Sequence, residues 1–360
     1  MFGNLFGKKK PEPTVQEIID EIDKGLTEDR ERNLKYLHGC GDKYKKHPQN
    51  LEILRHIGRL IARNMPDEAM EAFGAAMSQD MERMQSELAE ASRLIQERKI
   101  AEATKFLQER ELDEGFPEVL FREDELTVYL DFESSIDEAY YRITNQTSKE
   151  IKPAPIPFCQ SYKLAAYVAF ENKDYDKVLR ITEKGLKRCP MSADLKFERC
   201  EVFKIREQMD ELWKVMEESG PSFYRREDIA HQMRNLGWYF THKEDWEPAI
   251  ACYVASLYWK EGDMAQNELS YIVACGGSTI EDVKAMMGDY ERCKSALAAK
   301  GLSMMPINPK WIPILKMLGE KGEKEASYVF AAECYHWLHE LTGDEDAKKR
   351  LEACVRRAPR

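Results

Sequence analysis

The stretch 235–259, NLGWYFTHKEDWEPAIACYVASLYW, holds two amphipathic helical patterns separated by a short polar turn. Its first half places Gly237 and Phe240 on one face at the spacing of one helical turn. Its second half places Ala249 and Tyr253 on the matching face. Small residues therefore lie where aromatic ones arrive, which allows two helices to approach closely. The stretch predicts a hairpin of two antiparallel helices.

The spacing within this hairpin is that of a known repeat. The order W-x2-L-G-x2-Y and then A-x3-F is followed at Met233-x2-Leu236-Gly237-x2-Phe240 and at Ala249-x3-Tyr253. In this respect the chain resembles the tetratricopeptide repeat family, as a bacterial-type repeat protein, although Glu261 holds the place of the closing proline. The resemblance implies that helix hairpins stack into a curved array, whose concave side binds other proteins or peptides.

Related spacings recur along the chain. They are found at Leu54-x2-Ile57-Gly58-x2-Ile61 with Ala69-x3-Phe73, faintly at Ala91-x2-Leu94 with Ala103-x3-Leu107, and then at Tyr162-x2-Ala165-Ala166-x2-Ala169, Cys200-x2-Phe203 with Leu212-x3-Met216, and Tyr328-x2-Ala331 with Ala347-x3-Leu351. Between 290 and 322 the units are irregular, because Pro306, Pro309 and Pro313 interrupt them. The fold class that we predict is all-α: an α-solenoid of stacked hairpins with a small irregular or β-containing insert.

These patterns predict four parts of the chain. We expect a flexible tail over 1–13, an N-terminal helical array over 14–112, an irregular insert or junction over 113–158, and a C-terminal array of tetratricopeptide type over 159–358. A first helix is expected after Thr14, because Thr14 and Glu17 fit a capping box.

The insert lacks the helical period of its neighbours. The segment 126–132 alternates and is rich in β-prone residues, 136–143 has the pattern of a short helix, and 152–157 is dense in proline and should be extended. The insert could be a junction between two arrays or a lid against the binding surface.

Composition and charge exclude some classes of function. The net charge of −11 and the pI of about 5.4 give a typical phosphate backbone net repulsion, so we expect no nucleic acid as partner. Nine cysteines are scattered without a CxxC pair, which predicts neither a disulfide framework nor a zinc ribbon and fits a reducing cytoplasm. No apolar run is long enough to cross a bilayer, so we expect a cytoplasmic protein without stable membrane insertion.

The resemblance also implies which residues face a partner. In the family, positions two, five, nine, twelve and thirteen of each first helix line the concave side. On the two best repeats these positions hold Gln160, Lys163, Tyr167, Phe170 and Glu171, and then His231, Arg234, Trp238, Thr241 and His242. We expect partner contacts from Lys163, Tyr167, Phe170, His231, Arg234, Trp238 and His242. The other interpretation is that these aromatic side chains only pack against the insert or the next turn.

No set of residues at a catalytic spacing stands out. His336 and His339 lie one helical turn apart near Cys334, but they lack a third ligand at a known spacing. The segment 276–279 has the composition of a helix cap rather than of a phosphate-binding loop. We therefore expect no enzymatic activity, no cofactor and no metal ion.

Two functions remain open at this point. The first is a scaffold or adaptor that binds a protein or peptide through the concave face. The second is a ligand sensor or enzyme with a pocket between the insert and the C-terminal array.

Overall fold

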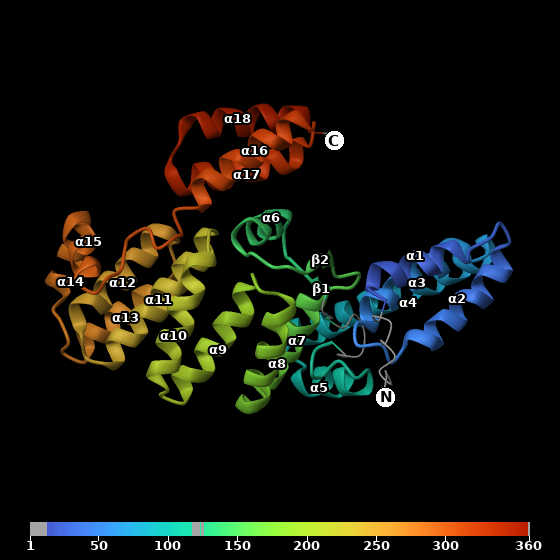
Figure 1. Cartoon of the computed structure of the whole chain (residues 1–360). Helices are drawn as coiled ribbons and strands as arrows, with labels where there is room; N and C mark the ends of the chain where they lie inside the picture. Colours follow the sequence, from blue (N-terminus) through green and yellow to red (C-terminus); the bar gives the residue numbers. More distant parts are fainter. Residues whose placement is uncertain (1–12, 117–122, 124–125, 359–360) are drawn as a thin grey trace, which may run out of the picture. The chain divides into compact units, whose positions relative to one another are not determined.

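The computed structural model describes residues 13–116, 123 and 126–358 (Figure 1). It is an all-α fold with one small two-stranded sheet, as the sequence predicts. Backbone contacts divide the chain into two compact units: unit 1 comprises 1–89, 119–129 and 147–156, and unit 2 comprises 90–118, 130–146 and 157–360. Residues 1–12 of the expected tail, 1–13, and the side chain of Phe73 lie outside the described residues. Every helix that the structure describes is too short or too polar to span a lipid bilayer.

Unit 1 is built from the helices at the start of the chain. These are α1 (Val15–Lys24), α2 (Arg30–Tyr44), α3 (Asn50–Asn64) and the first part of α4 (Asp67–Gln96). The predicted capping box is present, because the Thr14 side chain accepts from the Glu17 amide and the Glu17 carboxylate accepts from the Thr14 amide. Apolar residues from the stripes of α1, α2 and α3 form the core of this unit, among them Ile18, Ile22, Leu37, Ile53 and Ile57.

Unit 2 contains the remaining helices that the structure describes. They are α5 (Ile100–Glu109), α6 (Ser135–Thr144), α7 (Phe158–Glu171), α8 (Tyr175–Arg188), α9 (Ala193–Ile205), α10 (Met209–Ser219), the short 3-10 helix η1 (Gly220–Ser222), α11 (Arg226–His242), α12 (Trp246–Trp259), α13 (Asp263–Ala274), α14 (Ile280–Gly288), α15 (Tyr290–Ala298), α16 (Trp311–Lys324), α17 (Tyr328–Thr342) and α18 (Glu345–Arg357).

The helices α7 to α12 pack in succession as hairpins, each against the next, and Figure 1 shows them in a row. The hairpin predicted from 235–259 is formed by α11 and α12. A Cβ atom on Gly237 would lie 2.8 Å from the ring of Tyr253, so only glycine allows the two helices to come this close. The small residue thus lies opposite an aromatic one, as the sequence predicts.

The segments predicted inside the insert are also confirmed. A strand, β1 (Thr127–Leu130), pairs with β2 (Glu150–Pro153), and α6 connects them along the chain. Directly after β1, the Asp131 amide donates to the carbonyl of Arg188 at the end of α8, with an N···O distance of 2.8 Å. The beginning of α6 is thereby attached to the helical array.

Two local expectations differ from the structure. The faint repeat at Ala91 does not begin a new helix, because a single helix of 30 residues, α4, runs through it. No proline or glycine follows Gly74 within that helix, so nothing in the sequence stops it. Pro313 does not interrupt a helix either. It lies in the first turn of α16, where a proline removes no intrahelical hydrogen bond.

An aromatic cluster joins α6 to α16. The Trp311 ring stacks on Tyr140, with ring centroids 3.5 Å apart, and lies 4.3 Å from the ring of Tyr224. The Trp311 indole N–H donates to the carbonyl of Pro221 at 3.2 Å. Trp311 is fully buried, so this cluster is part of the core that α6 shares with α16, α17 and α18.

Candidate binding surface and cavity

The residues that the resemblance assigns to partner binding lie on α7 and α11, with α9 between them in the row. Three contacts connect these helices through their side chains: Lys163 with Asp194, Phe197 with His231, and Lys204 with Asn235. We call this surface the first-helix face. It is formed by Lys163, Tyr167, Phe170, Asp194, Phe197, Glu198, Glu201, Lys204, His231, Arg234, Trp238 and His242.

On α7, the ammonium of Lys163 already has partners. Its Nζ lies 2.8 Å from the carboxylate of Asp194 and 3.3 Å from that of Glu133, which follows β1. Burial favours the neutral amine, but the two carboxylates outweigh it, so the pKa of Lys163 is raised. Glu133 of the insert therefore already pairs with Lys163, which the resemblance assigns to a partner.

The two aromatic residues of α7 that the resemblance assigns to partner binding, Tyr167 and Phe170, are half-buried and make contacts within the chain. The hydroxyl of Tyr167 accepts a long hydrogen bond of 3.4 Å from Arg98, which follows α4. The ring of Phe170 meets Tyr175 edge-on, with centroids 5.8 Å apart. On α7, packing within the chain therefore accounts for part of the contacts of these aromatic side chains.

On α11, His231 is stacked against the neighbouring helix. Its ring centroid lies 3.8 Å from that of Phe197 on α9, and the two planes differ by 24°. Burial lowers the pKa of His231 to about 3, and the positive charges of Arg234 and Lys204 act in the same direction. The imidazole is therefore neutral at physiological pH and offers a flat, uncharged surface.

Arg234 differs from the other cations of this face. Its Nε is buried and has no hydrogen-bonding partner, and no carboxylate in the described part of the chain forms an ion pair with its guanidinium. Burial alone lowers its pKa. A half-buried guanidinium without a counterion is costly, because the lost hydration is not replaced. Such a group is suited to receive an anion from outside the chain.

Trp238 and His242 continue the same side of α11 beyond Arg234. Their rings are stacked with centroids 5.2 Å apart and planes inclined by 15°. The Nζ of Lys204 lies 5.8 Å from the centre of the Trp238 ring, while it donates to Glu201 and Asn235, each at 2.6 Å. Trp238 is half-buried and His242 is exposed, so a flat aromatic surface remains open to solvent beside Arg234.

The sequence analysis assigns no binding residues to α9. Its repeat is less regular, because Arg199 stands where an apolar residue is expected. The same family positions fall on Asp194, Phe197, Glu201 and Lys204, and three of these make the contacts that link the helices. The spacing of about 34 residues from α7 was the signal that could have found them.

Acidic groups gather on the α7 and α9 part of the face. Burial raises the pKa of Glu198 to about 7, and the nearby charges of Glu201, Asp194 and Glu171 act in the same direction. Arg234 on α11 is the opposite case, a cation without an anion. The face thus has an acidic part and a basic part on neighbouring helices.

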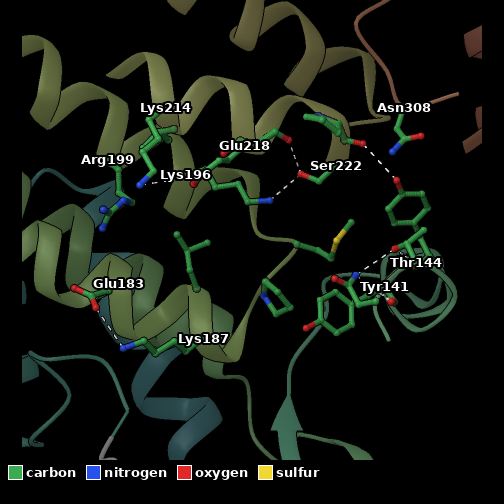
Figure 2. Close-up of a pocket in the computed structure, with 18 of the residues that line it drawn as sticks. Tyr141, Thr144, Glu183, Lys187, Lys196, Arg199, Lys214, Glu218, Ser222 and Asn308 are labelled. Carbon is green, nitrogen blue, oxygen red and sulfur yellow. Dashed lines mark hydrogen bonds and ion pairs between the residues drawn. The ribbon is translucent and has the colours of Figure 1, made fainter. Parts of the chain in front are cut away.

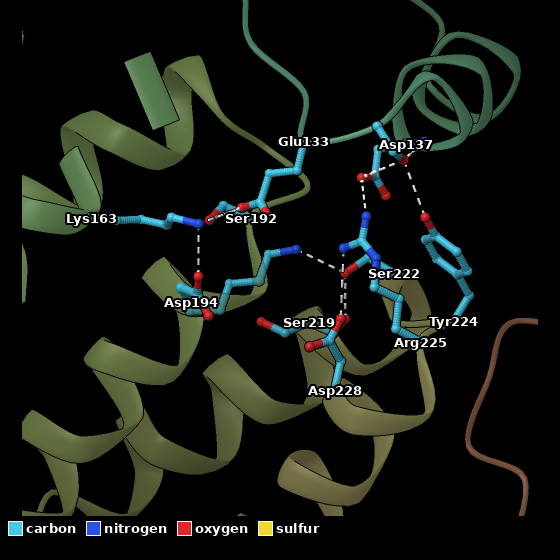
Figure 3. Close-up of polar contacts among 12 residues, drawn as sticks. Glu133, Asp137, Lys163, Ser192, Asp194, Ser219, Ser222, Tyr224, Arg225 and Asp228 are labelled. Carbon is cyan, nitrogen blue, oxygen red and sulfur yellow. Dashed lines mark hydrogen bonds and ion pairs between the residues drawn. The ribbon is translucent and has the colours of Figure 1, made fainter. Parts of the chain in front are cut away.

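A buried ionic network lies where the insert meets the beginnings of α9 and α11 (Figure 3). Asp137, in the first turn of α6, accepts from Arg225 at 2.7 Å and from the Ser134 hydroxyl at 2.9 Å. Burial raises the pKa of Asp137, and Arg225 opposes this effect. The side chain of Asp137 is 3% exposed, so this is a desolvated ion pair between residues 88 positions apart.

Lys196 lies between this network and a cavity. Its Nζ donates to the Ser222 hydroxyl at 2.8 Å, and its residue is 8% exposed. Burial lowers the pKa of Lys196 to about 8, although the carboxylates of Asp137 and Asp228 oppose this effect. The amine is therefore closer to neutrality than an ordinary lysine.

The cavity itself measures about 830 Å³ and opens between α6 and the helices α8, α9 and α10 (Figure 2). Its wall includes Tyr140 and Tyr141 from α6, and Lys196 from α9. Further charged side chains of both signs line it, namely Glu183, Lys187, Arg199, Glu211, Lys214, Glu218 and Lys310. A cavity of this size can hold a small polar molecule.

Each histidine of the pair on α17 makes a contact within the chain. His336 lies edge-on against Trp337, with centroids 4.8 Å apart, and His339 Nδ1 is 3.1 Å from the carbonyl oxygen of Asp344. Within the described residues, neither belongs to a group of three metal-ligating side chains. The segment 276–279 precedes α14, and the hydroxyl of Thr279 accepts from the Asp282 amide as the cap of that helix.

No protein-family model and no curated protein matches this chain.

Proposed function

We propose that this protein is a scaffold or adaptor of tetratricopeptide type, which binds a protein or peptide partner through the first-helix face of α7, α9 and α11. The observation that carries the proposal is the unpaired guanidinium of Arg234, next to the open aromatic surface of Trp238 and His242. The free thiols of the nine cysteines support an assignment to a reducing cytoplasm.

Arg234 supplies the polar part of this recognition. A carboxylate from a partner would restore the charge balance that the chain itself leaves open, and arginine can hold it through two parallel hydrogen bonds. Because the guanidinium is already partly desolvated, part of the cost of burying it is met by folding rather than by binding. The partner should therefore present an Asp, a Glu or a C-terminal carboxylate at this position.

The aromatic rings supply the apolar part. Trp238 is held by its stack on His242 and by the nearby ammonium of Lys204, so little side-chain entropy is lost when a partner covers it. Tryptophan and arginine are the residue types that most often dominate binding energy in protein interfaces. An extended peptide with an apolar side chain next to its carboxylate fits both groups.

The experiment compares affinity purifications of the wild type and of the double variant Arg234→Ala/Trp238→Ala, read by quantitative mass spectrometry. We expect the double variant to lose its main partners, with at least a tenfold lower yield. The matched control is Lys284→Ala/Tyr271→Ala, which removes an exposed cation and an exposed aromatic residue from α14 and α13. If the double variant is folded, as judged by circular dichroism, and still retains all partners of the wild type, the proposal is wrong.

A second candidate function is favoured by the cavity between α6 and α8 to α10. A small molecule bound there would hold α6 of the insert against the array, as in a ligand sensor. The test is a thermal shift of the whole chain with a panel of small mono- and dicarboxylates and phosphates. A sensor would show a raised Tm for one of them, abolished by Lys196→Met, whereas the Arg234→Ala/Trp238→Ala variant would keep the shift.

A further inference from the structure

Three metal-ligating side chains meet where the insert joins α7 and α8. The ligand atoms of Asp131, Cys159 and Cys189 all lie within 4.8 Å of one another. Asp131 follows β1, Cys159 lies in the first turn of α7, and Cys189 is the residue that ends α8. Both cysteines are buried, with 5% and 0% of their surface exposed. Residues 28 to 58 positions apart in the sequence are thus brought to one point by the fold.

Asp131 has no cationic partner in the described part of the chain. Its Oδ2 accepts from the Cys159 amide at 2.8 Å, and its carbonyl oxygen accepts from the Cys159 thiol at 3.5 Å. Among the described residues, no lysine, arginine or histidine forms an ion pair with it, although it is partly buried and Glu133 lies close by. A carboxylate that is balanced by no cation of the described chain thus lies beside two buried thiols.

We propose that Asp131, Cys159 and Cys189 form a binding site for a divalent cation of the zinc class. In a tetrahedral zinc shell the sulfur and oxygen ligands lie about 2.3 Å and about 2.1 Å from the metal, so that they are about 3.6–3.8 Å from one another. The observed limit of 4.8 Å requires the ligand atoms to close by about 1 Å at most. Rotation of the Cys159 side chain at the start of α7 and of the Cys189 side chain at the end of α8 can bring the ligand atoms this much closer.

The donor set selects the metal. Two thiolates are soft ligands that zinc accepts and that magnesium and calcium do not, while the carboxylate excludes a purely sulfur site. On binding, each thiol loses its proton to solvent, so one Zn²⁺ with two thiolates and one carboxylate leaves the site with one negative charge.

A second cysteine pair in the same unit provides a matched control. Cys252 on α12 and Cys293 on α15 are both buried and near each other. The Cys293 thiol donates to the Ala251 carbonyl at 3.3 Å, and no aspartate or glutamate joins this pair in a metal-ligating group within the described residues. This pair has two thiols without the third ligand, so we expect it to bind metal weakly or not at all.

The experiment uses the whole reduced chain, stripped of metal and titrated with Co²⁺ as a spectroscopic substitute for Zn²⁺. We expect thiolate-to-cobalt charge-transfer bands and tetrahedral d–d bands that saturate at one ion per chain and disappear when Zn²⁺ is added. Cys159→Ser/Cys189→Ser should lose these bands, and Asp131→Asn should weaken the affinity for Co²⁺. The control Cys252→Ser/Cys293→Ser should keep both the bands and the affinity.

The proposal is overturned if the wild type shows no such bands, or if the bands survive in Cys159→Ser/Cys189→Ser. A measurement on the wild type alone covers the case in which that variant does not fold. X-ray absorption of the zinc-loaded protein should then show two sulfur ligands at about 2.3 Å together with oxygen or nitrogen ligands. A shell without sulfur, or with four sulfurs, would also refute the site.

Discussion

Two cations of the first-helix face, Lys163 on α7 and Arg234 on α11, occupy the same position of their repeats but differ in what surrounds them. Lys163 is held by two carboxylates, one of which comes from the insert. Arg234 is half-buried and has no carboxylate partner among the described residues. The position of a residue on its helix thus sets the direction of its side chain. Contacts from neighbouring segments determine whether that side chain is available to a partner.

The cations that are bound by the insert have a different role from Arg234. Near α7 the insert contributes Glu133, and near the start of α11 it contributes Asp137, so the cations Lys163 and Arg225 stabilise the fold. Arg234, nine residues beyond Arg225, takes part in neither of these contacts. Substitutions of the paired cations should therefore reduce stability, and substitution of Arg234 should reduce partner binding.

The largest expected effect comes from Arg225→Met. This change leaves the Asp137 carboxylate, which is 3% exposed, without its cation. Removing one partner of a buried pair costs about 3–5 kcal/mol, because the remaining charge stays desolvated. Urea unfolding should show this loss, and Arg225→Lys should recover part of it. An unchanged midpoint of unfolding for Arg225→Met would show that the ionic network does not hold the insert.

Lys163→Met should lower the free energy of unfolding by a smaller amount, about 1–2 kcal/mol. The Lys163 side chain is 30% exposed, so water can partly hydrate the carboxylates that lose its ammonium. The matched variant Arg234→Met removes a cation of similar size that has no partner. It should change the free energy of unfolding by less than about 0.5 kcal/mol or raise it. Equal losses for the two variants, measured by urea unfolding, would contradict the comparison between them.

The smallest effect is a pH-dependent one at Glu198. Its pKa is raised from 4.5 to about 7 in the folded chain, first by burial and then by Glu201, Asp194 and Glu171. The folded state therefore holds a proton that the unfolded state has lost, so stability falls as the pH rises from 4.5 to 7. Glu198→Gln has no proton to lose and should raise Tm by about 2–4 °C above pH 7 but not below pH 4.5. Calorimetry across this range measures it, and an equal change at both ends would rule out the titration of Glu198.

Much of the fold follows from local sequence signals. The helix that begins after Thr14 is fixed by a capping box within four residues, and the hairpin of α11 and α12 by the small residue Gly237 opposite Tyr253. The strand β1 and the helix α6 follow from a change of hydrophobic period. These features could be predicted because each depends on residues close together in the chain or on one repeated spacing.

The candidate sites depend on distant residues and were only partly predicted. The resemblance placed Arg234 and Trp238 on one side of α11, but it could not show that Lys163 is already occupied by Glu133, 30 positions earlier. The cavity and the Asp131, Cys159 and Cys189 cluster arise from the way the insert meets the array, for which one sequence holds no local pattern. Electrostatic pairing across such distances becomes visible only in the folded chain.

The burial of Trp311 between Tyr140 and Tyr224 gives the protein a built-in optical reporter. Indole fluorescence depends on the polarity around the ring. The Trp311 ring is shielded from water by Tyr140 of α6 on one side and by Tyr224, in the loop before α11, on the other. Detachment of α6 would wet the indole and shift its emission to longer wavelength. Of the six tryptophans, Trp311 is the one whose ring stacks on a side chain of α6 in the described part of the chain.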